Sequence, residues 1–329
     1  MPVTIMDIAQ ACGVSAGTVD RALNNRPGIK PETKRRILEV ARQMNYRPDY
    51  LARSLARGRT MTLGVIMYDL NNRSLSQIIN AIHNKAREYD YFIDFVMSDQ
   101  DPHKEKDHIE YLVNRKVDGI ILFPCNYGQD YDDYLATLNT PIVTIINRIS
   151  DRWPYIGIDD TTAMKQAVEL IRQRGYEHII YICPNLSSRG RSNTYVWEKR
   201  LDGVLEGVRQ FREEDRLTIV KEEQYIQALE EMDLTSLGKT AILCSCDFHA
   251  LEIMIYLREK GISVPKDIGL MGFDNIDTLR YVTPSLTTID YAVKEIGTRA
   301  VEALLAQIEG NPSSYVPLLD YKIIQGDSL

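Results

Sequence analysis

The stretch TIMDIAQACGVSAGTVDRALNN, residues 4–25, carries the signals of two short helices joined by a tight turn. Thr4 can cap the first helix, and Asp7 stands in the third helical position, which together make a capping-box pattern. Gly13 can take the positive φ that a turn between helices requires. Ser15 can then cap the second helix. The stretch therefore predicts two short helices around a glycine turn.

A third helix is predicted over residues 31–45, PETKRRILEVARQMN, whose apolar stripe is formed by Ile37, Val40, Ala41 and Met44. Three short helices with a glycine turn between the first two describe a helix-turn-helix, whose second helix lies in the major groove of DNA. In that second helix we expect Val19 and Leu23 to face inward. The outward positions are Ala16, Gly17, Asp20 and Arg21. A small helical bundle with a structural role is the alternative interpretation.

Charge is distributed unevenly along the chain. Residues 1–60 contain eleven Lys and Arg against five Asp and Glu, a balance of +6. The whole chain has a net charge of −7, so the remaining residues carry a balance of −13. A basic head on an acidic body indicates that the head alone meets a polyanion, and it favours the DNA-binding interpretation of the three helices.

The length and composition fit a protein with more than one domain. Its 329 residues are 44% hydrophobic and 26% charged, which provides apolar surface for a large core. The start, MPVTIMDIAQ, lacks the pattern of a signal peptide, and the longest apolar runs are of strand length. No zinc-finger spacing links histidine to the cysteines, which are Cys12, Cys125, Cys183, Cys244 and Cys246. We expect a cytoplasmic protein with buried free thiols.

From residue 60 onward, short apolar strands alternate with amphipathic helices. Strands are predicted within residues 61–69, 92–99, 117–125, 141–148, 178–184, 240–247 and 268–275. The helices predicted between them include 75–88, 161–174, 195–212, 248–260 and 292–309. This alternation favours parallel α/β sheets, and a body of about 270 residues favours two lobes over one sheet. Such sheets bind ligands beyond the carboxyl ends of their strands.

Motifs of the common enzyme classes are missing from the body. It contains no GxxxxGK[ST], no GxGxxG after a strand, no GxSxG and no HExxH. The five histidines have no metal-ligand spacing, and His103 and His108 fall in a predicted surface helix. We therefore expect no enzyme activity, no cofactor and no metal. A catalytic site scattered over several strand ends stays open, and turnover of a sugar would reveal it.

Two parts of the sequence carry a family resemblance. They are residues 3–66, VTIMDIAQACGVSAGTVDRALNNRPGIKPETKRRILEVARQMNYRPDYLARSLARGRTMTLGVI, and the segments VPKDIGLMGFDN and PSLTTIDYAVKEIGTRAVEALL of the body. The chain resembles lactose-repressor-type (LacI/GalR) transcription factors over almost its whole length. The resemblance implies a helix-turn-helix domain in residues 1–46 and a hinge helix with linker in 47–60. It also implies a core of two periplasmic-binding-protein-like lobes in 61–329, joined by three crossings, with an effector between them.

The resemblance also implies which residues contact DNA. Arg21 occupies a base-reading position and can bind guanine O6 and N7 together. Ala16 offers only a methyl contact, and Gly17 only its backbone. Asp20 stands where the better-known members have serine, and its carboxylate repels phosphate unless it accepts from a cytosine amine or pairs with Arg21. The implied DNA contacts are Thr4, Ser15, Ala16, Gly17, Thr18, Asp20, Arg21, Asn25, Tyr46, Arg53, Leu55 and Ala56.

Strand ends supply candidates for effector binding. Asp247 and Asp274 end two predicted strands, where their carboxylates suit sugar hydroxyls or a purine edge. Arg200 stands where the family places its effector-binding arginine. Tyr225 matches a family position whose aromatic ring covers the ligand. These four residues are expected to meet in one cleft.

Two more candidates bear on the charge of the effector. Asn147, or its neighbour Ile146 in a shifted register, occupies a further pocket strand, and Arg73 lies in the first cleft loop. Arg73 and Arg200 facing one cleft from opposite lobes would favour an acidic or phosphorylated sugar, bound through charge-assisted bonds. A neutral sugar held by the two strand-end aspartates is the competing case.

These observations together predict an effector-controlled transcription factor, a repressor of carbohydrate-utilisation genes. Its expected partners are near-palindromic operator DNA, a sugar or sugar derivative, and a second copy of the chain. No leucine heptads follow QGDSL, so we expect a homodimer rather than a tetramer. A catabolite-control-type regulator that uses a phosphoprotein co-effector is the alternative.

The segment LARSLARGRT, residues 51–60, supplies a first test. It is too short to hold a helix alone in water, and in the family it folds on operator DNA. Leu55 matches the leucine that wedges between the central base pairs. Leu55→Ala should weaken operator binding by about 2–4 kcal/mol and leave folding, effector binding and non-specific DNA binding unchanged. A gel-shift titration with equal loss on operator and random DNA, or with no loss on either, contradicts the wedge role.

Overall fold

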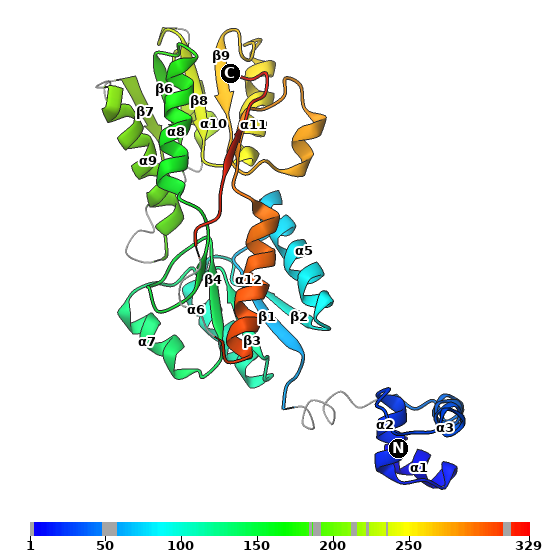
Figure 1. Ribbon diagram of the computed structural model, residues 1–329. Helices are drawn as coiled ribbons and strands as arrows, with labels where there is room; N and C mark the ends of the chain where they lie inside the picture. The colour runs from blue at the N-terminus through cyan, green and yellow to red at the C-terminus, as the bar shows by residue number, and fades with distance from the viewer. Residues whose placement is uncertain are drawn as a thin grey trace. The chain divides into compact units, whose positions relative to one another are not determined.

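The computed structural model describes residues 3–47, 58–183, 186, 192–211, 216–221, 224–234, 236–311 and 317–329. The chain divides into two compact units, Met1–Thr60 and Met61–Leu329. The first is a small helical head, and the second is an α/β body with two lobes (Figure 1).

The head contains three helices, α1 (Ile5–Cys12), α2 (Ala16–Leu23) and α3 (Pro31–Gln43). The predicted capping box is present, because Thr4 Oγ1 accepts from the backbone N–H of Asp7 and Asp7 Oδ2 accepts from that of Thr4. Gly13 ends α1 with a φ of 61°, and the Ser15 side chain caps α2. The helix-turn-helix expected from residues 4–25 is therefore confirmed.

The core of the head lies where the three helices meet. Ile8 of α1, Val19 of α2 and Ile37 of α3 are completely buried in it. Ala22, and not Leu23, is the second buried residue of α2, and Leu23 is half-buried. A domain this small has more apolar side chains than interior, so the predicted stripes are only partly covered.

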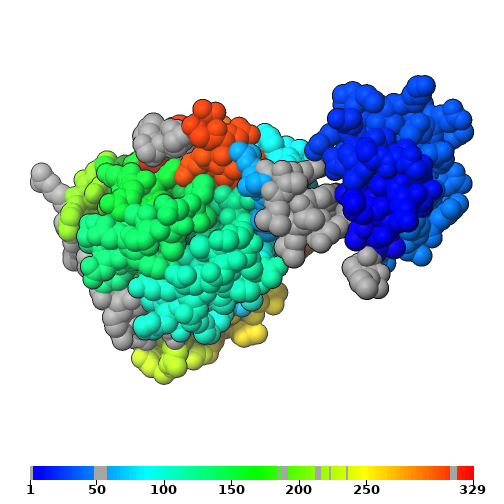
Figure 2. All heavy atoms as spheres, turned by 90° about the horizontal axis from the view of Figure 1, so that it is seen from below, coloured from blue at the N-terminus to red at the C-terminus, as the bar shows by residue number. Residues whose placement is uncertain are grey.

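The N-lobe is built on a parallel sheet with the strand order β2-β1-β3-β4-β5. Its strands are β1 (Thr62–Met67), β2 (Phe92–Met97), β3 (Gly119–Leu122), β4 (Ile142–Ile145) and β5 (Tyr155–Ile156). Its helices are α5 (Arg73–Glu88), α6 (Pro102–Asn114), α7 (Gln129–Thr137) and, from the far end of the chain, α12 (Val293–Ile308). Helix α12 packs along α5, and its orange surface adjoins the cyan and green N-lobe surface in Figure 2.

The C-lobe has a second parallel sheet with the order β7-β6-β8-β9. Its strands are β6 (His178–Ile182), β7 (Leu217–Val220), β8 (Thr240–Cys244) and β9 (Ile268–Met271). Around them lie α8 (Asp160–Gln173), α9 (Tyr195–Phe211), α10 (Tyr225–Glu230), α11 (Asp247–Glu259) and a 3₁₀ turn, η3 (Asp277–Tyr281). A small antiparallel pair, β10 (Thr288–Asp290) and β11 (Lys322–Ile324), completes it.

All seven predicted strands form within the predicted ranges, and β3, β4 and β9, with four residues each, have about half of the expected length. The sequence missed β5, β7, β10 and β11, which have at most four residues each and carry weak patterns. Strand β7 is the four-residue run LTIV, which is too short to be told from a segment of helix by its pattern alone. The two-lobed parallel α/β architecture is confirmed.

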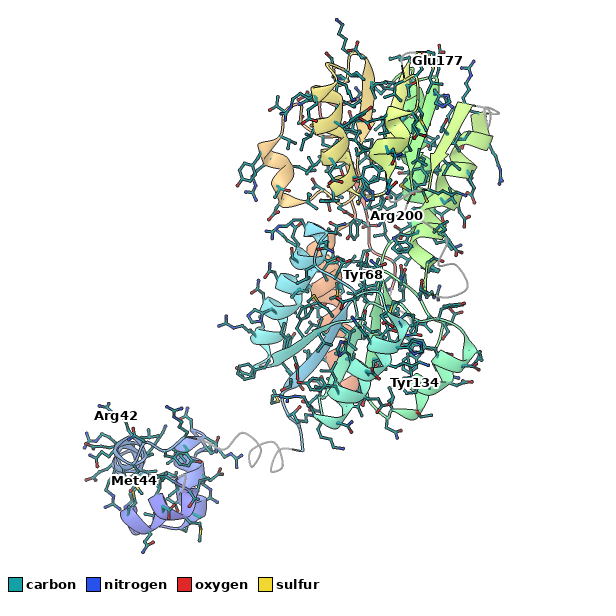
Figure 3. The ribbon with its side chains drawn as sticks, turned by 180° about the vertical axis from the view of Figure 1, so that it is seen from behind. Arg42, Met44, Tyr68, Tyr134, Glu177 and Arg200 are labelled. Atoms are coloured by element: carbon teal, nitrogen blue, oxygen red, sulfur yellow. The ribbon has the colours of Figure 1, made fainter. Side chains whose placement is uncertain are left out.

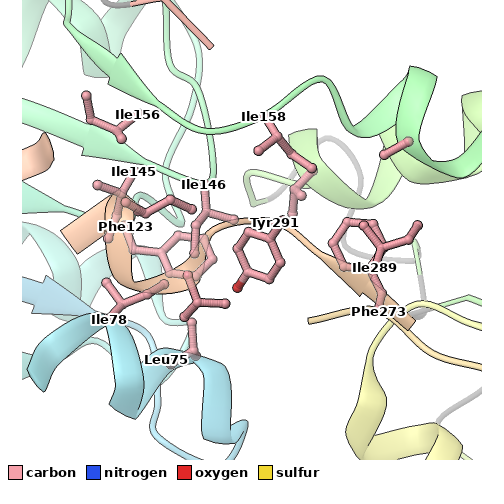
Figure 4. Close-up of a cluster of buried hydrophobic side chains, with 14 of the residues drawn as sticks. Leu75, Ile78, Phe123, Ile145, Ile146, Ile156, Ile158, Phe273, Ile289 and Tyr291 are labelled. Carbon is pink, nitrogen blue, oxygen red and sulfur yellow. The ribbon is translucent and has the colours of Figure 1, made fainter. Parts of the chain in front are cut away.

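Three described segments connect the lobes: residues 157–159, 290–292 and 317–321 (Figure 1). Two of them are tied together, because Leu319 N donates to Gly157 O at 2.9 Å. One apolar cluster runs through this junction from Leu75 and Ile146 of the N-lobe to Phe273 of the C-lobe (Figure 4). Tyr291 of the second connection lies between these two groups, so the lobes share part of one core.

Two expectations about the chain's chemistry can be compared with the structure. All five cysteines are free thiols; four are buried and Cys246 is partly exposed, so buried free thiols are confirmed with that one difference. None of the helices in the described part of the chain is long and apolar enough to cross a bilayer.

The contact between α8 and α9 supplies a test of the C-lobe packing. A Cβ atom added at Gly203 of α9 would lie 2.2 Å from the carbonyl oxygen of Thr161 in α8. Gly203→Ala should therefore push the two helices apart and lower the free energy of unfolding by about 1–3 kcal/mol. Glu206→Ala, on the exposed face of α9, should change it by less than about 0.5 kcal/mol. Equal urea midpoints for the two variants would contradict the close approach.

Candidate DNA-binding head and effector cavity

The outward face of α2 presents one long cationic side chain. Arg21 and Gly17 are exposed, and Ala16 is half-buried against the head core. Asp20 accepts a 2.7 Å bond from Asn24 Nδ2 and forms an ion pair with Arg26 at 3.3 Å. Asp20 thus pairs with Arg26 rather than with Arg21, which leaves the Arg21 guanidinium available for a base edge.

Most other predicted DNA contacts take part in the fold of the head. The Thr4 hydroxyl donates to Asp7, and the Ser15 and Thr18 hydroxyls lie 2.9 Å apart in the cap of α2. Asn25 accepts from Lys34, and Tyr46 packs against the head core. Their contacts with DNA remain predictions. Arg53, Leu55 and Ala56 lie outside the described residues.

A cavity of about 700 Å³ lies between the two lobes of the body. Residues just beyond the carboxyl ends of five strands line it: Tyr68 after β1, Phe123 after β3, Ile146 after β4, Cys183 after β6 and Ser245 after β8. Figure 3 shows Tyr68 and Arg200 at the facing edges of the two lobes. The cavity is where the parallel-sheet rule places a ligand.

Arg200 of α9 lines the cavity and is held firmly in the C-lobe. Its side chain is buried, Nε donates to Asp160 Oδ1 at 2.9 Å, and Nη1 donates to the carbonyl oxygen of Ser245 at 2.6 Å. The guanidinium carbon lies 3.6 Å from the centre of the Phe273 ring. Burial raises the pKa of Asp160, and the adjacent Arg200 counteracts this. These contacts orient the guanidinium and leave Nη2 for a ligand.

Asp274 lines the cavity from the end of β9 and reaches across to the N-lobe. Its side chain is only 2% exposed, and Oδ2 accepts from Asn72 Nδ2 at 2.9 Å. Its φ of 125° lies in a region that side chains other than glycine rarely adopt, a form of strain that is common at functional sites. Burial raises the pKa of Asp274, whereas Arg200 and the Asn72 bond lower it. Asp274 therefore offers a buried acceptor to a ligand.

Asp247 was expected in the cleft but does not line the cavity. It is completely buried, and it accepts from Thr288 Oγ1 at 2.6 Å and from the backbone N–H of Ile276 at 2.9 Å. Burial, followed by the charge of Asp274, raises the pKa of Asp247. Asp247 supports the backbone around Asp274 and does not itself face the cavity.

Of the two neighbours that the sequence proposed for the next pocket strand, Ile146 lines the cavity and Asn147 does not. Asn147 Nδ2 donates to the carbonyl oxygens of Pro124 and Asn193, and its Oδ1 accepts from Val196 N. Three backbone groups therefore satisfy the hydrogen-bonding atoms of the Asn147 amide. The sequence had left the register between these two neighbours open.

Arg73 is a further correction. It is the first residue of α5 and forms a two-bond ion pair with Asp277 of η3, with distances of 2.9 and 2.8 Å. The Arg73 guanidinium lowers the pKa of the Asp277 carboxyl. Arg73 does not line the cavity, so the two guanidiniums expected in one cleft are not brought together.

Tyr225, the first residue of α10, lines the cavity as expected. Its hydroxyl donates to Glu252, and its ring centre lies 4.7 Å from that of His249. The sequence missed several lining residues, among them Tyr68, Asn72, Phe123, Trp197, Phe248, His249 and Tyr291. Tyr68 and Phe123 lie near the carboxyl ends of predicted strands, so the rule that selected the aspartates could have found them.

Comparison with known proteins agrees with this geometry. The model of the bacterial regulatory proteins, lacI family, matches residues 4–49, and that of the periplasmic binding protein-like domain matches residues 168–329. The chain thus has a LacI-family helix-turn-helix domain and a periplasmic-binding-protein-like domain.

Curated relatives match this chain over nearly their full length. It is 29% identical to the HTH-type transcriptional regulator RegA of Clostridium acetobutylicum, over 100% of this chain and 99% of RegA. It is 29% identical to catabolite control protein A of Staphylococcus epidermidis, over 96% and 97% of the two chains. MalR of Clostridium butyricum is 28% identical, over 98% of each. This protein is a DNA-binding transcriptional regulator.

Solved structures show the same fold. The Lac repressor dimer bound to operator and an anti-inducer superposes with a TM-score of 0.86 at 24% identity, over 100% of this chain and 99% of that one. A LacI-family regulator from Silicibacter pomeroyi has a TM-score of 0.78 at 26% identity, over 99% of both chains. The helix-turn-helix head and the two-lobed core are thus shared with these proteins.

The exposed guanidinium on α2 yields a prediction for this regulator. Arg21→Ala should cost about 1–3 kcal/mol of operator affinity and relax the preference at one operator position. Arg42 is an exposed cation on α3, and Arg42→Ala should weaken binding to all DNA sequences alike or leave it unchanged. A gel-shift titration against operator variants measures both. An Arg21→Ala protein that keeps the wild-type preference at every position would exclude Arg21 as a base reader.

Proposed function

We propose that this regulator represses carbohydrate-utilisation genes and that a neutral sugar in the interlobe cavity controls its affinity for DNA. The observation that carries the proposal is the pairing of a fixed guanidinium, Arg200, with a buried carboxylate, Asp274, in a cavity lined by aromatic rings. Sugar hydroxyls need both donors and acceptors in fixed positions, and sugar ring faces are apolar enough to lie on aromatic side chains.

The charges around the cavity favour a neutral ligand. Among the described lining residues, three acidic side chains, Asp69, Glu252 and Asp274, face one guanidinium, Arg200. That guanidinium is already paired with Asp160. The second guanidinium needed for an acidic or phosphorylated sugar, that of Arg73, pairs with Asp277 outside the cavity. An anionic ligand would therefore meet more repulsion than attraction.

Contacts between the lobes suggest how a ligand acts on DNA binding. Asn72 caps α5 and at the same time donates to Asp274, and its neighbour Arg73 holds Asp277. A sugar hydroxyl on Asp274 competes with Asn72 for the carboxylate. Ligand binding then shifts the balance between two lobe arrangements, and the effect on DNA equals the difference in ligand affinity between them.

The same proposal covers the oligomeric state, the operator and the domain boundaries of the regulator. The regulator would act as a cytoplasmic homodimer on a near-palindromic operator, and catalysis is not part of its function. Its DNA-binding domain would occupy residues 1–46, its hinge and linker 47–60, and its effector-binding core 61–329. The division of the chain after Thr60 supports the last boundary.

A phosphoprotein co-effector is a second candidate, favoured by the similarity to catabolite control protein A. A phosphate on a partner would need exposed cations near the hinge side of the body. On α5 and α12, Lys85 is paired with Glu88 and Glu302, and Arg299 with Glu295 and Glu302. These two cations are already paired, whereas Arg87 of α5 and Lys294 of α12 are exposed and form no ion pair among the described residues. The sugar remains the first choice because of the donors, acceptors and aromatic rings that line the cavity.

A panel of sugars and sugar phosphates tests the proposed effector. A neutral sugar should raise the melting temperature of the full chain and change its operator affinity, because a ligand stabilises the state that it binds. Asp274→Asn should weaken binding of that sugar at least about tenfold, since a hydrogen bond to a charged group contributes about 1.5–3 kcal/mol. Isothermal titration measures the affinity.

Asp202→Asn, on the exposed side of α9, is the matched control and should leave sugar affinity unchanged. Tighter binding of a sugar phosphate, together with a loss of that binding in Arg73→Ala, would contradict the neutral-sugar proposal. Operator affinity that responds to no sugar would refute effector control by the cavity.

A further inference from the structure

The cavity continues beyond Arg200 and Asp274 to a wall made by α10 and α11. Three aromatic rings meet on this wall: Tyr225, His249 and Phe248. The plane of the His249 ring is tilted by 53° to that of Tyr225 and by 61° to that of Phe248. The ring centres of Tyr225 and His249 are 4.7 Å apart, and those of His249 and Phe248 are 6.0 Å apart. We call these three residues the aromatic shelf.

The shelf is partly open to solvent. Phe248 is 44% exposed, although it belongs to the first turn of a helix that packs on the sheet and it lines the cavity. A large apolar ring in contact with water is costly, since its burial would contribute about 1.5–3 kcal/mol. A ligand that covers the Phe248 ring would gain this free energy of burial.

The shelf is uncharged but has polar groups at its edge. Burial lowers the pKa of His249 to about 4, so its imidazole is neutral at pH 7 and can offer one donor and one acceptor. Its Nδ1 lies 3.4 Å from Ser245 Oγ. Glu252 accepts from the Tyr225 hydroxyl and also lines the cavity, where its second carboxylate oxygen can accept from a ligand hydroxyl.

We propose that the aromatic shelf is a second sugar subsite and that the effector is a disaccharide or a longer saccharide. The inference rests on the proposed function, because it takes the first sugar ring to bind at Arg200 and Asp274. The second ring lies with its apolar face on the shelf and its hydroxyls against His249 and Glu252. The cavity of about 700 Å³ lies within the range that encloses drug-sized ligands, which leaves room for more than one ring.

The charge of the wall sets the class of the second ring. The carboxylate of Glu252 disfavours a phosphate or an acidic sugar at this position, and neutral His249 supplies no compensating cation. Aromatic faces stabilise cations as well, and the lining carboxylates outnumber Arg200, so the wall disfavours an anion and admits a neutral or a cationic ring. A neutral, hydroxyl-rich ring fits both observations.

Calorimetric titration of the full chain with matched sugar pairs tests the shelf. The pairs are glucose with maltose, glucose with cellobiose, and galactose with lactose. For at least one pair the disaccharide should bind at least about tenfold more tightly than its monosaccharide. Phe248→Ala should remove most of this difference while it changes monosaccharide affinity less than about twofold. Glu252→Gln, which keeps the size of the side chain, should also reduce the difference.

Tyr127→Ala is the matched control, because Tyr127 is 43% exposed and does not line the cavity. It should leave both affinities unchanged, and the melting temperatures of the variants show that they fold. Equal affinity for both members of every pair overturns the shelf and leaves the neutral-sugar proposal intact. Equal loss of mono- and disaccharide binding in Phe248→Ala likewise overturns the shelf and leaves the neutral-sugar proposal intact. A chain that binds no sugar in any pair overturns both.

Discussion

A buried guanidinium needs partners for its charge, and the organisation of the effector cavity follows from how Arg200 meets this need. Burying a charge without compensation costs several kcal/mol, so Arg200 binds Asp160 at the start of α8 and the carbonyl of Ser245 at the end of β8. Its guanidinium also lies on Phe273, beyond β9. One side chain on α9 thereby connects a neighbouring helix to the ends of two strands.

This arrangement explains why Asp274 can remain buried on the cavity wall. Burial raises the pKa of Asp274 to about 7, although the positive charge of Arg200 and a hydrogen bond from Asn72 of the other lobe lower it. The residue that is best placed to receive a ligand is therefore also one that holds the two lobes together. A ligand that replaces Asn72 acts on both roles at once, which is the physical requirement for coupling between binding and lobe arrangement.

Local signals predicted the residues whose roles depend on strand ends. Asp274 follows a strand and lines the cavity as the parallel-sheet rule predicts. Arg200 and Tyr225, which lie on helices, were expected there from the family resemblance and also line it. Asp247 and Asn147 also stand at strand ends, but their side chains are bound by hydroxyl and backbone groups from distant segments. A pattern of residue types does not show which polar groups at a strand end are already satisfied.

The sequence by itself determined the helix-turn-helix head, the alternation of strands and helices, and the charge contrast between head and body. These properties depend on caps, turns and periodicity, which act between residues close in the chain. Only the tertiary structure decided that Arg73 pairs with Asp277, which is 204 residues away in the chain, and does not enter the cavity. It also decided that Tyr225, His249 and Phe248 form one wall, because α10 and α11 become neighbours only when the second sheet has assembled. Charge pairing and ring contact depend on distances in space, and those are set by the packing of the whole lobe.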